Sequence, residues 1–274
     1  MTEIKVISKP LEAIKAKTSG LARVKHKLLV LSGKGGVGKS TVAVNLAMAL
    51  VQRGRRVGVL DADLHGPSVP KLLGASEAAL EIADGHMHPI KVAPGLMVVS
   101  IAYLVPEPDA PVVWRGPIKM GAIKQFVEDV EWGELDYLIV DLPPGTGDEP
   151  LSVAQTIPEA DGVVVVTTPQ DVALISVRRS IRFTRMLGLE VIGLVDNMNG
   201  FICPHCGQAS QIFGSDLAES AAKEYDVPYL GKIPLLGSVA LSGEKGRPFV
   251  LGEGPDAQAF QGIVDQIVKS VEKE

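Results

Sequence analysis

Cysteine is almost missing from this chain of 274 residues, which has only Cys203 and Cys206. One C-x-x-C pair cannot build a framework of disulfides, so the two thiols are candidates for a metal-ligand or redox pair. Long apolar runs are missing as well: none approaches the roughly 18 residues that span a bilayer, and the N-terminus has no signal-peptide core. We therefore expect a cytoplasmic protein with no membrane partner.

Aromatic residues and positive charge are also in short supply. Aromatics make up 4% of the chain, against 46% hydrophobic residues overall, so a large core has to be built from Val, Leu, Ile and Ala. Such a composition suits buried parallel strands. The formal net charge is −5, which disfavours nucleic-acid binding as the main role.

Apolar runs alternate with segments of helical pattern along the chain. The pattern predicts strands at about 27–32, 55–60, 96–102, 137–140, 162–168, 191–195 and 229–233, and helices ending near 53 and covering about 118–130, 172–187 and 255–271. This alternation indicates an α/β fold with a doubly wound, mostly parallel sheet flanked by helices. We expect a helical lead-in over 1–24, one domain over 25–274, and a proline-rich loop insertion over 66–117 with a single strand.

A glycine-dense loop joins the first predicted strand to the first helix. It fits G-x-x-x-x-G-K-[ST] without a mismatch. Such a loop points successive backbone N–H groups at phosphate oxygens, the lysine reaches the β/γ-phosphates, and the hydroxyl lies on Mg²⁺. The predicted nucleotide-binding residues are Gly33, Lys34, Gly35, Gly36, Val37, Gly38, Lys39, Ser40 and Thr41.

Carboxylates follow two of the predicted strands. Asp141 ends the apolar run 138–140, which is the Walker B arrangement, and Asp61 and Asp63 follow the strand at 55–60. A nucleotide-triphosphate site needs such acids at the carboxyl ends of neighbouring strands to hold Mg²⁺ and orient water. We expect Ser40, Asp61 and Asp141 at the magnesium ion, and Lys39 and Asp63 in catalysis; by spacing alone, Lys34 can equally be a solvated loop residue.

The C-x-x-C motif, Cys203-Pro204-His205-Cys206, admits several interpretations. A zinc knuckle needs four ligands and there is no second pair; a thioredoxin-like redox motif opens a helix, whereas Pro204 and Gly207 indicate a turn here. Two chains together would supply four thiolates, enough for a bridging [4Fe–4S] cluster or for zinc. The spacing alone leaves the metal open.

Taken together, the motifs resemble those of the Mrp/ApbC family of iron–sulfur cluster carrier ATPases, within the MinD/nitrogenase-iron-protein class. The resemblance covers about 25–270 and is carried by ordered motifs. They are the deviant loop at 33–41 with its early lysine, D-A-D-L-H-G-P-S at 61–68, W-R-G-P at 114–117, D-L-P-P-G-T-G-D at 141–148, and N-M at 197–198 leading to the C-x-x-C.

The resemblance implies a role for each matching residue. It assigns Lys34 to the partner's nucleotide in a face-to-face homodimer, Asp63 to the attacking water, and Asp141 to Mg²⁺ through water. It also assigns Asn197 to the adenine of ATP, with Pro234 as a weaker candidate beside the base. Cys203 and Cys206 then share a [4Fe–4S] cluster across the dimer for transfer to apo iron–sulfur proteins.

Two other functions remain open from the sequence. One is a positioning ATPase like MinD or ParA, which needs a basic amphipathic helix or a basic surface. The C-terminal segment carries an apolar stripe, but its polar face mixes Asp265, Lys269 and Glu272, without the cationic excess of a membrane anchor. The other is a zinc-bridged dimeric nucleotidase, because zinc and iron–sulfur sites use the same thiolates.

Overall fold

A computed structural model describes residues 20–83, 86–104, 116–203, 205–213 and 217–272. The helices are α1 (Lys39–Gln52), α2 (Val69–Leu72), α3 (Gly116–Glu128), α4 (Asp148–Thr156), α5 (Asp171–Met186), α6 (Leu217–Glu224), α7 (Gly237–Glu244) and α8 (Pro255–Val271). The strands are β1 (Val24–Leu31), β2 (Val57–Asp61), β3 (Glu81–Ala83), β4 (His86–His88), β5 (Ile90–Ala93), β6 (Leu96–Ser100), β7 (Leu135–Asp141), β8 (Gly162–Thr167), β9 (Val191–Ile202), β10 (Ala209–Ser210) and β11 (Tyr229–Leu235).

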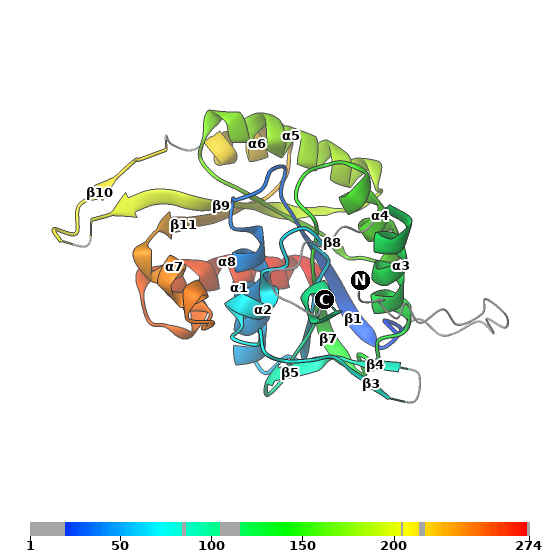
Figure 1. The fold of residues 1–274 in the computed structure, drawn as a ribbon. Coiled ribbons are helices and arrows are strands. Elements are labelled where there is room, and N and C mark those ends of the chain that lie inside the picture. The colour runs from blue at the N-terminus through cyan, green and yellow to red at the C-terminus, as the bar shows by residue number, and fades with distance from the viewer. Residues whose placement is uncertain (1–19, 84–85, 105–115, 204, 214–216, 273–274) are drawn as a thin grey trace, which may run out of the picture.

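One nine-stranded sheet runs through the molecule, with helices packed on both faces (Figure 1). Its strand order is β10-β9-β8-β1-β7-β2-β6-β5, and β11 pairs in parallel with β9. Only β5 and β10 are antiparallel to their neighbours in this sheet. The predicted doubly wound, mostly parallel α/β fold is therefore confirmed.

Successive side chains of the central strand β1 point to opposite faces of the sheet, so the core consists of one layer on each face. Leu29 and Leu31 of β1 pack with residues of α3, α4, α5 and α6, whereas Leu28 and Val30 pack on the opposite face with α1 and α8. All four side chains are fully buried. A strand buried on both faces reads as a continuous apolar run. The sheet is therefore rigid at the point where β1 delivers the glycine loop.

The segment 66–117 has more regular structure than predicted. Besides β6, it contains the short strands β3 and β4, which form a separate two-stranded ribbon, and β5 at the sheet edge. The ribbon is fastened to the domain because the Met87 N–H donates to the Asp129 carbonyl (3.1 Å) and the Glu131 N–H to the Met87 carbonyl (2.9 Å). The expectation of a loop with one strand was wrong here.

The lead-in predicted for 1–24 falls mainly on residues 1–19, outside the described part of the chain. Residues 20–23 form a turn, and Val24 already belongs to β1. Leu21 and Val24 are buried, as an anchoring segment requires. Within the described ranges, no helix combines the length and apolar character that a membrane crossing needs.

Strand β9 continues well beyond the predicted 191–195. Its residues up to Asn197 pair with β8 and β11. Beyond them, Phe201 pairs with both β11 and β10, and Ile202 pairs with β10. Left-handed backbone at Met198 (φ 62°) and Gly200 (φ 84°) bends the strand between these two parts. Figure 1 shows the resulting β9–β10 hairpin projecting from the body of the molecule. We call its residues 201–203 and 205–210 the β9–β10 arm.

Candidate functional site

The glycine loop lies between β1 and α1, at the carboxyl edge of the sheet. Gly36 and Gly38 have left-handed φ angles of 76° and 85°, which residues with a Cβ rarely adopt, and Gly38 immediately precedes α1. The helix N-terminus adds a partial positive charge. A cavity of about 300 Å³ lies over the loop, lined by Ser32, Gly35, Gly36, Gly38, Lys39, Ser40, Thr41, Asp63, Gly66, Ser68, Leu72 and Pro144.

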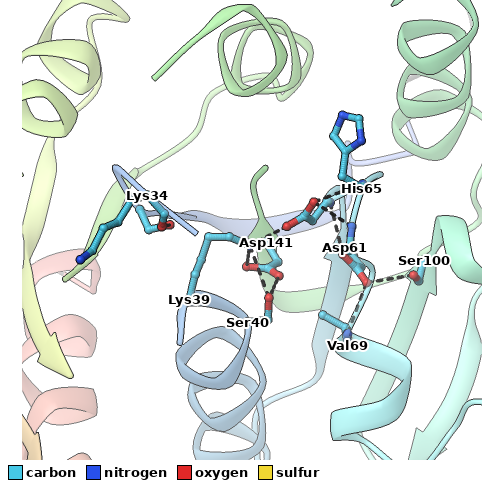
Figure 2. Close-up of polar contacts among 11 residues, drawn as sticks. Lys34, Lys39, Ser40, Asp61, His65, Val69, Ser100 and Asp141 are labelled. Atoms are coloured by element: carbon cyan, nitrogen blue, oxygen red, sulfur yellow. Dashed lines mark hydrogen bonds and ion pairs between the residues drawn. The ribbon is translucent and has the colours of Figure 1, made fainter. Parts of the chain in front are cut away.

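Asp141 holds the lysine and the hydroxyl of the loop together. The Lys39 Nζ donates to Asp141 Oδ1 (2.6 Å), and the Ser40 Oγ–H donates to Oδ2 (2.5 Å). Asp141 is completely buried at the end of β7, and burial raises its pKa, while the Lys39 charge and both hydrogen bonds oppose that rise. Figure 2 shows the three side chains meeting above the start of α1. The predicted Walker A and Walker B residues thus converge.

Asp63 faces the same cavity from the loop after β2. Its Oδ2 lies 3.8 Å from Lys39 Nζ, and its Oδ1 accepts hydrogen bonds from the N–H groups of His65 and Gly66 (3.3 Å each). The carboxylate is mostly buried but lines the cavity wall. One free edge of this carboxylate is consequently available to a molecule bound over the loop.

Asp61, two residues earlier, is not brought to Ser40. Its carboxylate accepts from Ser100 Oγ (2.9 Å) and from the N–H groups of Asp63 (3.2 Å) and Val69 (3.4 Å). Figure 2 shows this side chain turned toward β6 and α2. Burial, with the charge of Asp141 as a second cause, raises the pKa of Asp61 to about 8.

Lys34 points away from Lys39, Ser40 and Asp141 (Figure 2), and it is not among the residues that line the cavity. Its Nζ donates to the Oε1 of Gln170 (2.9 Å), the residue just before α5. Gly33 packs directly on α5, since a Cβ there would lie 2.5 Å from the Ser176 carbonyl oxygen. The early lysine of the loop therefore lies half-buried beside the start of α5.

A second cavity, of about 370 Å³, adjoins the first and shares Gly38, Thr41, Ser68 and Leu72 with it. Asn197 and Pro234, the two residues predicted beside the adenine, both line it. Asn197 is buried, and its Nδ2 donates to the carbonyl of Val37 in the loop (2.8 Å). The second cavity and the glycine loop are therefore joined through the side chain of Asn197.

The two cysteines lie on the β9–β10 arm. The Gly207 N–H donates to the Cys203 carbonyl (2.9 Å), and the Cys203 N–H to the Gln208 carbonyl (3.0 Å), which closes the predicted turn. Cys203 is half-buried and Cys206 is exposed. Backbone N–H groups of Cys206 and His205 donate to the Cys203 sulfur and lower its pKa. Among the described residues, no group of three or more Cys, His, Asp or Glu side chains is arranged to hold a metal ion.

Sequence reasoning missed Ser100 and Gln170, the partners of Asp61 and Lys34. Ser100 ends an apolar strand at the same sheet edge as the carboxylates, which was the signal available for it. Gln170 gave no such signal, because its contact spans 136 positions of sequence. Of the W-R-G-P motif, residues 114 and 115 lie outside the described part of the chain.

Comparisons with known proteins show the family of this chain. The model of the NUBPL iron-transfer P-loop NTPase family, within ParA, matches residues 23–269. An iron-sulfur cluster carrier protein of Methanocaldococcus jannaschii is 49% identical over 252 residues, covering 92% of this chain and 87% of the relative. The cytosolic Fe-S cluster assembly factor NUBP2 of Bos taurus is 47% identical over 252 residues, covering 90% and 93%.

Solved structures show the same relationship. A nucleotide-binding protein of Archaeoglobus fulgidus in complex with ADP is 37% identical, with a TM-score of 0.75 over 86% of this chain and 91% of that chain. The MinD ATPase of Pyrococcus furiosus, at 23% identity and a TM-score of 0.65 over 89% and 98%, shares the fold. The resemblance to iron–sulfur cluster carrier ATPases is confirmed, and the chain belongs to the NUBPL iron-transfer P-loop NTPase family.

Proposed function

We propose that this protein is an ATP-hydrolysing carrier that holds a [4Fe–4S] cluster between two copies of the chain and transfers it to apo iron–sulfur proteins. The observation that carries the proposal is that one chain has its own nucleotide cavity but too few thiols to hold a [4Fe–4S] cluster. One chain carries a cavity over the glycine loop that Lys39, Ser40 and Asp63 line, whereas the arm offers two thiols and no further ligand among the described residues. The names of the relatives support an iron–sulfur cargo and, for NUBP2, a cytosolic location.

In this proposal the two adjoining cavities take the two ends of ATP. The N–H groups of the glycine loop and Lys39 bind the phosphates, and Asn197 and Pro234 flank the adenine. Lys39 exchanges its bond to Asp141 for one to phosphate oxygens. An ADP complex of the Archaeoglobus fulgidus relative supports this use of the fold.

Ser40 and Asp141 fit a magnesium ion by the chemistry of their groups, because a hydroxyl that lines the phosphate cavity and a carboxylate are neighbours there. Mg²⁺ prefers such oxygen ligands together with phosphate oxygens and water. When bound, the ion would neutralise charge on the β- and γ-phosphates.

Hydrolysis in this proposal uses one residue from each copy of the chain. Asp63 has an edge facing the cavity and orients the attacking water. Lys34 is held beside α5 by Gln170 and reaches the phosphates of the partner subunit, where it stabilises charge as an arginine finger does. Its direction in Figure 2, away from Lys39 and Asp141 of its own chain, supports this assignment.

Four thiolates are needed for a [4Fe–4S] cluster. Two β9–β10 arms meeting across a homodimer would supply Cys203 and Cys206 from each copy. A positioning ATPase like MinD has no use for these thiols, so the shared fold does not favour that function. A zinc-bridged dimeric nucleotidase uses the same four sulfurs and is the second candidate.

The test is anaerobic reconstitution with iron and sulfide, followed by metal analysis, visible absorbance and measurement of molecular mass. We expect about four irons and four sulfides per dimer, with a broad brown absorbance that Cys203→Ala/Cys206→Ala abolishes. Ser210→Ala, an exposed change on the same arm, serves as the matched control and should reconstitute normally. Stoichiometric zinc with no chromophore would establish the second candidate instead.

A further inference from the structure

Asp61 is a predicted magnesium ligand whose carboxyl group makes its hydrogen bonds away from Lys39 and Ser40, unlike that of Asp141. It is completely buried at the end of β2, beside Asp141 in the register of β2 and β7. It lines neither of the two cavities assigned to the nucleotide. A buried carboxylate is costly unless its oxygens accept hydrogen bonds. The groups that donate hydrogen bonds to Asp61 therefore indicate its structural role.

Two of these donors are the two ends of one loop. Asp61 Oδ1 accepts from the N–H of Asp63 (3.2 Å), and Oδ2 accepts from the N–H of Val69 (3.4 Å), the first residue of α2. The loop 62–68, which joins β2 to α2, carries Asp63, the proposed water-orienting residue. A single side chain thus fixes where this loop leaves the sheet and where it enters the next helix.

The third donor, Ser100, anchors that side chain to the neighbouring strand. Ser100 is completely buried, stands opposite Asp61 in the register of β2 and β6, and donates to Oδ2 at 2.9 Å. Its Oγ also accepts from the Ala102 N–H (3.2 Å). The hydroxyl thus donates to Asp61 and accepts from the backbone after β6, and it links the Asp61 carboxyl group to the neighbouring strand.

We infer that Ser100 and Asp61 act as a pair of positioning residues for ATP hydrolysis, holding the 62–68 loop so that the Asp63 carboxylate stays at the phosphate end of the cavity. The inference rests on the proposed function in that Asp63 is taken to orient water. Neither Ser100 nor Asp61 touches the nucleotide in this account. Both act through the loop, so their loss should slow turnover more than it weakens binding.

The test compares steady-state ATP hydrolysis and ADP affinity in Ser100→Ala with the wild type. Small misplacement of a catalytic group costs one to two orders of magnitude in rate. We therefore expect kcat to fall about tenfold or more, with KM and the Kd for ADP within about twofold of the wild type. Thr184→Val is the matched control, because Thr184 is another completely buried hydroxyl that donates only to the Ser180 carbonyl; its kinetics should be those of the wild type.

A double-mutant cycle shows whether Ser100 acts through Asp61. Asp61→Asn should slow turnover as well. The double variant should be little slower than Asp61→Asn alone, because the effects of two substitutions on the rate do not add when the residues act through the same contacts. Ser100→Cys keeps the volume and a weak donor. It should give an intermediate rate, and it carries the test if the alanine variant does not fold.

Three results would overturn the inference: a wild-type rate in Ser100→Ala, an equal loss of rate and ADP affinity, or fully additive effects in the cycle. A wild-type protein that hydrolyses no ATP would instead contradict the proposed function. The two failures are therefore distinguished before any variant is compared.

Discussion

Gly38 combines a left-handed backbone with a crowded position in the phosphate-binding loop. Its φ of 85° is left-handed, and a Cβ added there would lie 2.2 Å from the Asn197 Nδ2. Gly38→Ala should therefore push Asn197 away from the loop and lower the affinity for ADP tenfold or more, about 1.4 kcal/mol. Isothermal titration calorimetry measures this directly.

Gly54 offers a matched control for that variant. It has a similar φ of 76° but no atom within 4 Å of an added Cβ, and it lies just after α1, away from the cavity. Gly54→Ala should cost about 1 kcal/mol of stability through backbone strain and leave ADP affinity unchanged. Equal losses of affinity in both variants would mean that strain alone, and not the contact with Asn197, governs binding.

Asp61 also predicts how stability depends on pH in the protein without nucleotide or magnesium. Burial raises its folded pKa to about 8 from an unfolded value of 3.8. Between these values the folded state keeps a proton that the unfolded chain has lost, so stability should fall as pH rises toward 8 and level off above it.

Urea unfolding at pH 5.5 and pH 8 measures the effect, which should amount to at most about 3 kcal/mol. Asp61→Asn cannot titrate and should remove much of the slope, while Asp141, whose pKa is also raised by burial, retains a part. A slope that is the same in wild type and Asp61→Asn would show that the carboxyl is not protonated in the folded state near neutral pH.

At the scale of elements, α2 and α7 both line the second cavity, the one proposed for the base, and two glycines allow their close approach. Gly246, just after α7, has a φ of 62°, and a Cβ on it would lie 2.4 Å from the Cα of Gly74, just after α2. Gly246→Ala should force the two elements apart. We expect ATP affinity to fall several-fold while the affinity for inorganic tripolyphosphate stays the same.

Gly237→Ala is the control at the other end of α7, where an added Cβ would meet no atom within 4 Å. It should bind both ligands as the wild type does. If Gly246→Ala weakened tripolyphosphate as much as ATP, the contact between α2 and α7 would act on the phosphate end and not on the base.

How well an element could be predicted depends on how much of its signal is local. The C-terminal helix, at Pro255–Val271, has the predicted bounds, because seventeen residues of one periodicity and a proline at the start carry its signal. Helices α4, α6 and α7 are eight or nine residues long and were missed. The ribbon of β3 and β4 was missed because three-residue strands show no alternation and depend on distant contacts.

For the candidate site too, local sequence patterns predicted some features and not others. The spacing of G-x-x-x-x-G-K-[ST] and the acids at strand ends predicted which residues converge on the cavity. Orientation could not be predicted, because it depends on partners far away in sequence. Asp61 turns to Ser100, 39 positions later, and Lys34 turns to Gln170, 136 positions later. Local patterns hold no information on either contact.

At the scale of the whole molecule, the Lys34 side chain points away from Lys39 and Asp141 of its own chain, which leads to a test of the proposed dimer. Lys34→Ala and Asp63→Ala should each bind ADP normally and hydrolyse ATP slowly. When the two are mixed, half of the dimers combine both chains, and one of the two sites in such a dimer has an intact Lys34 and an intact Asp63. The mixture should recover about a quarter of wild-type turnover.

The control mixes Lys34→Ala with the double variant Lys34→Ala/Asp63→Ala, which restores no site. Turnover in the first mixture that is no higher than in this control would mean that Lys34 serves its own chain. Because the variants leave Lys39 and Asn197 unchanged, loss of nucleotide binding in either single variant would also contradict the roles assigned here.

The β9–β10 arm has a consequence for how such proteins diversify. None of its residues belongs to either buried cluster that holds the sheet and helices together, and it leaves the body by a bend at Met198 and Gly200. Changes in the hairpin can therefore accumulate without unfolding the ATPase. Selection on what the arm binds and selection on nucleotide binding therefore act on separate parts of one chain. Proteins with this fold can change what the arm binds while the nucleotide-binding domain stays the same.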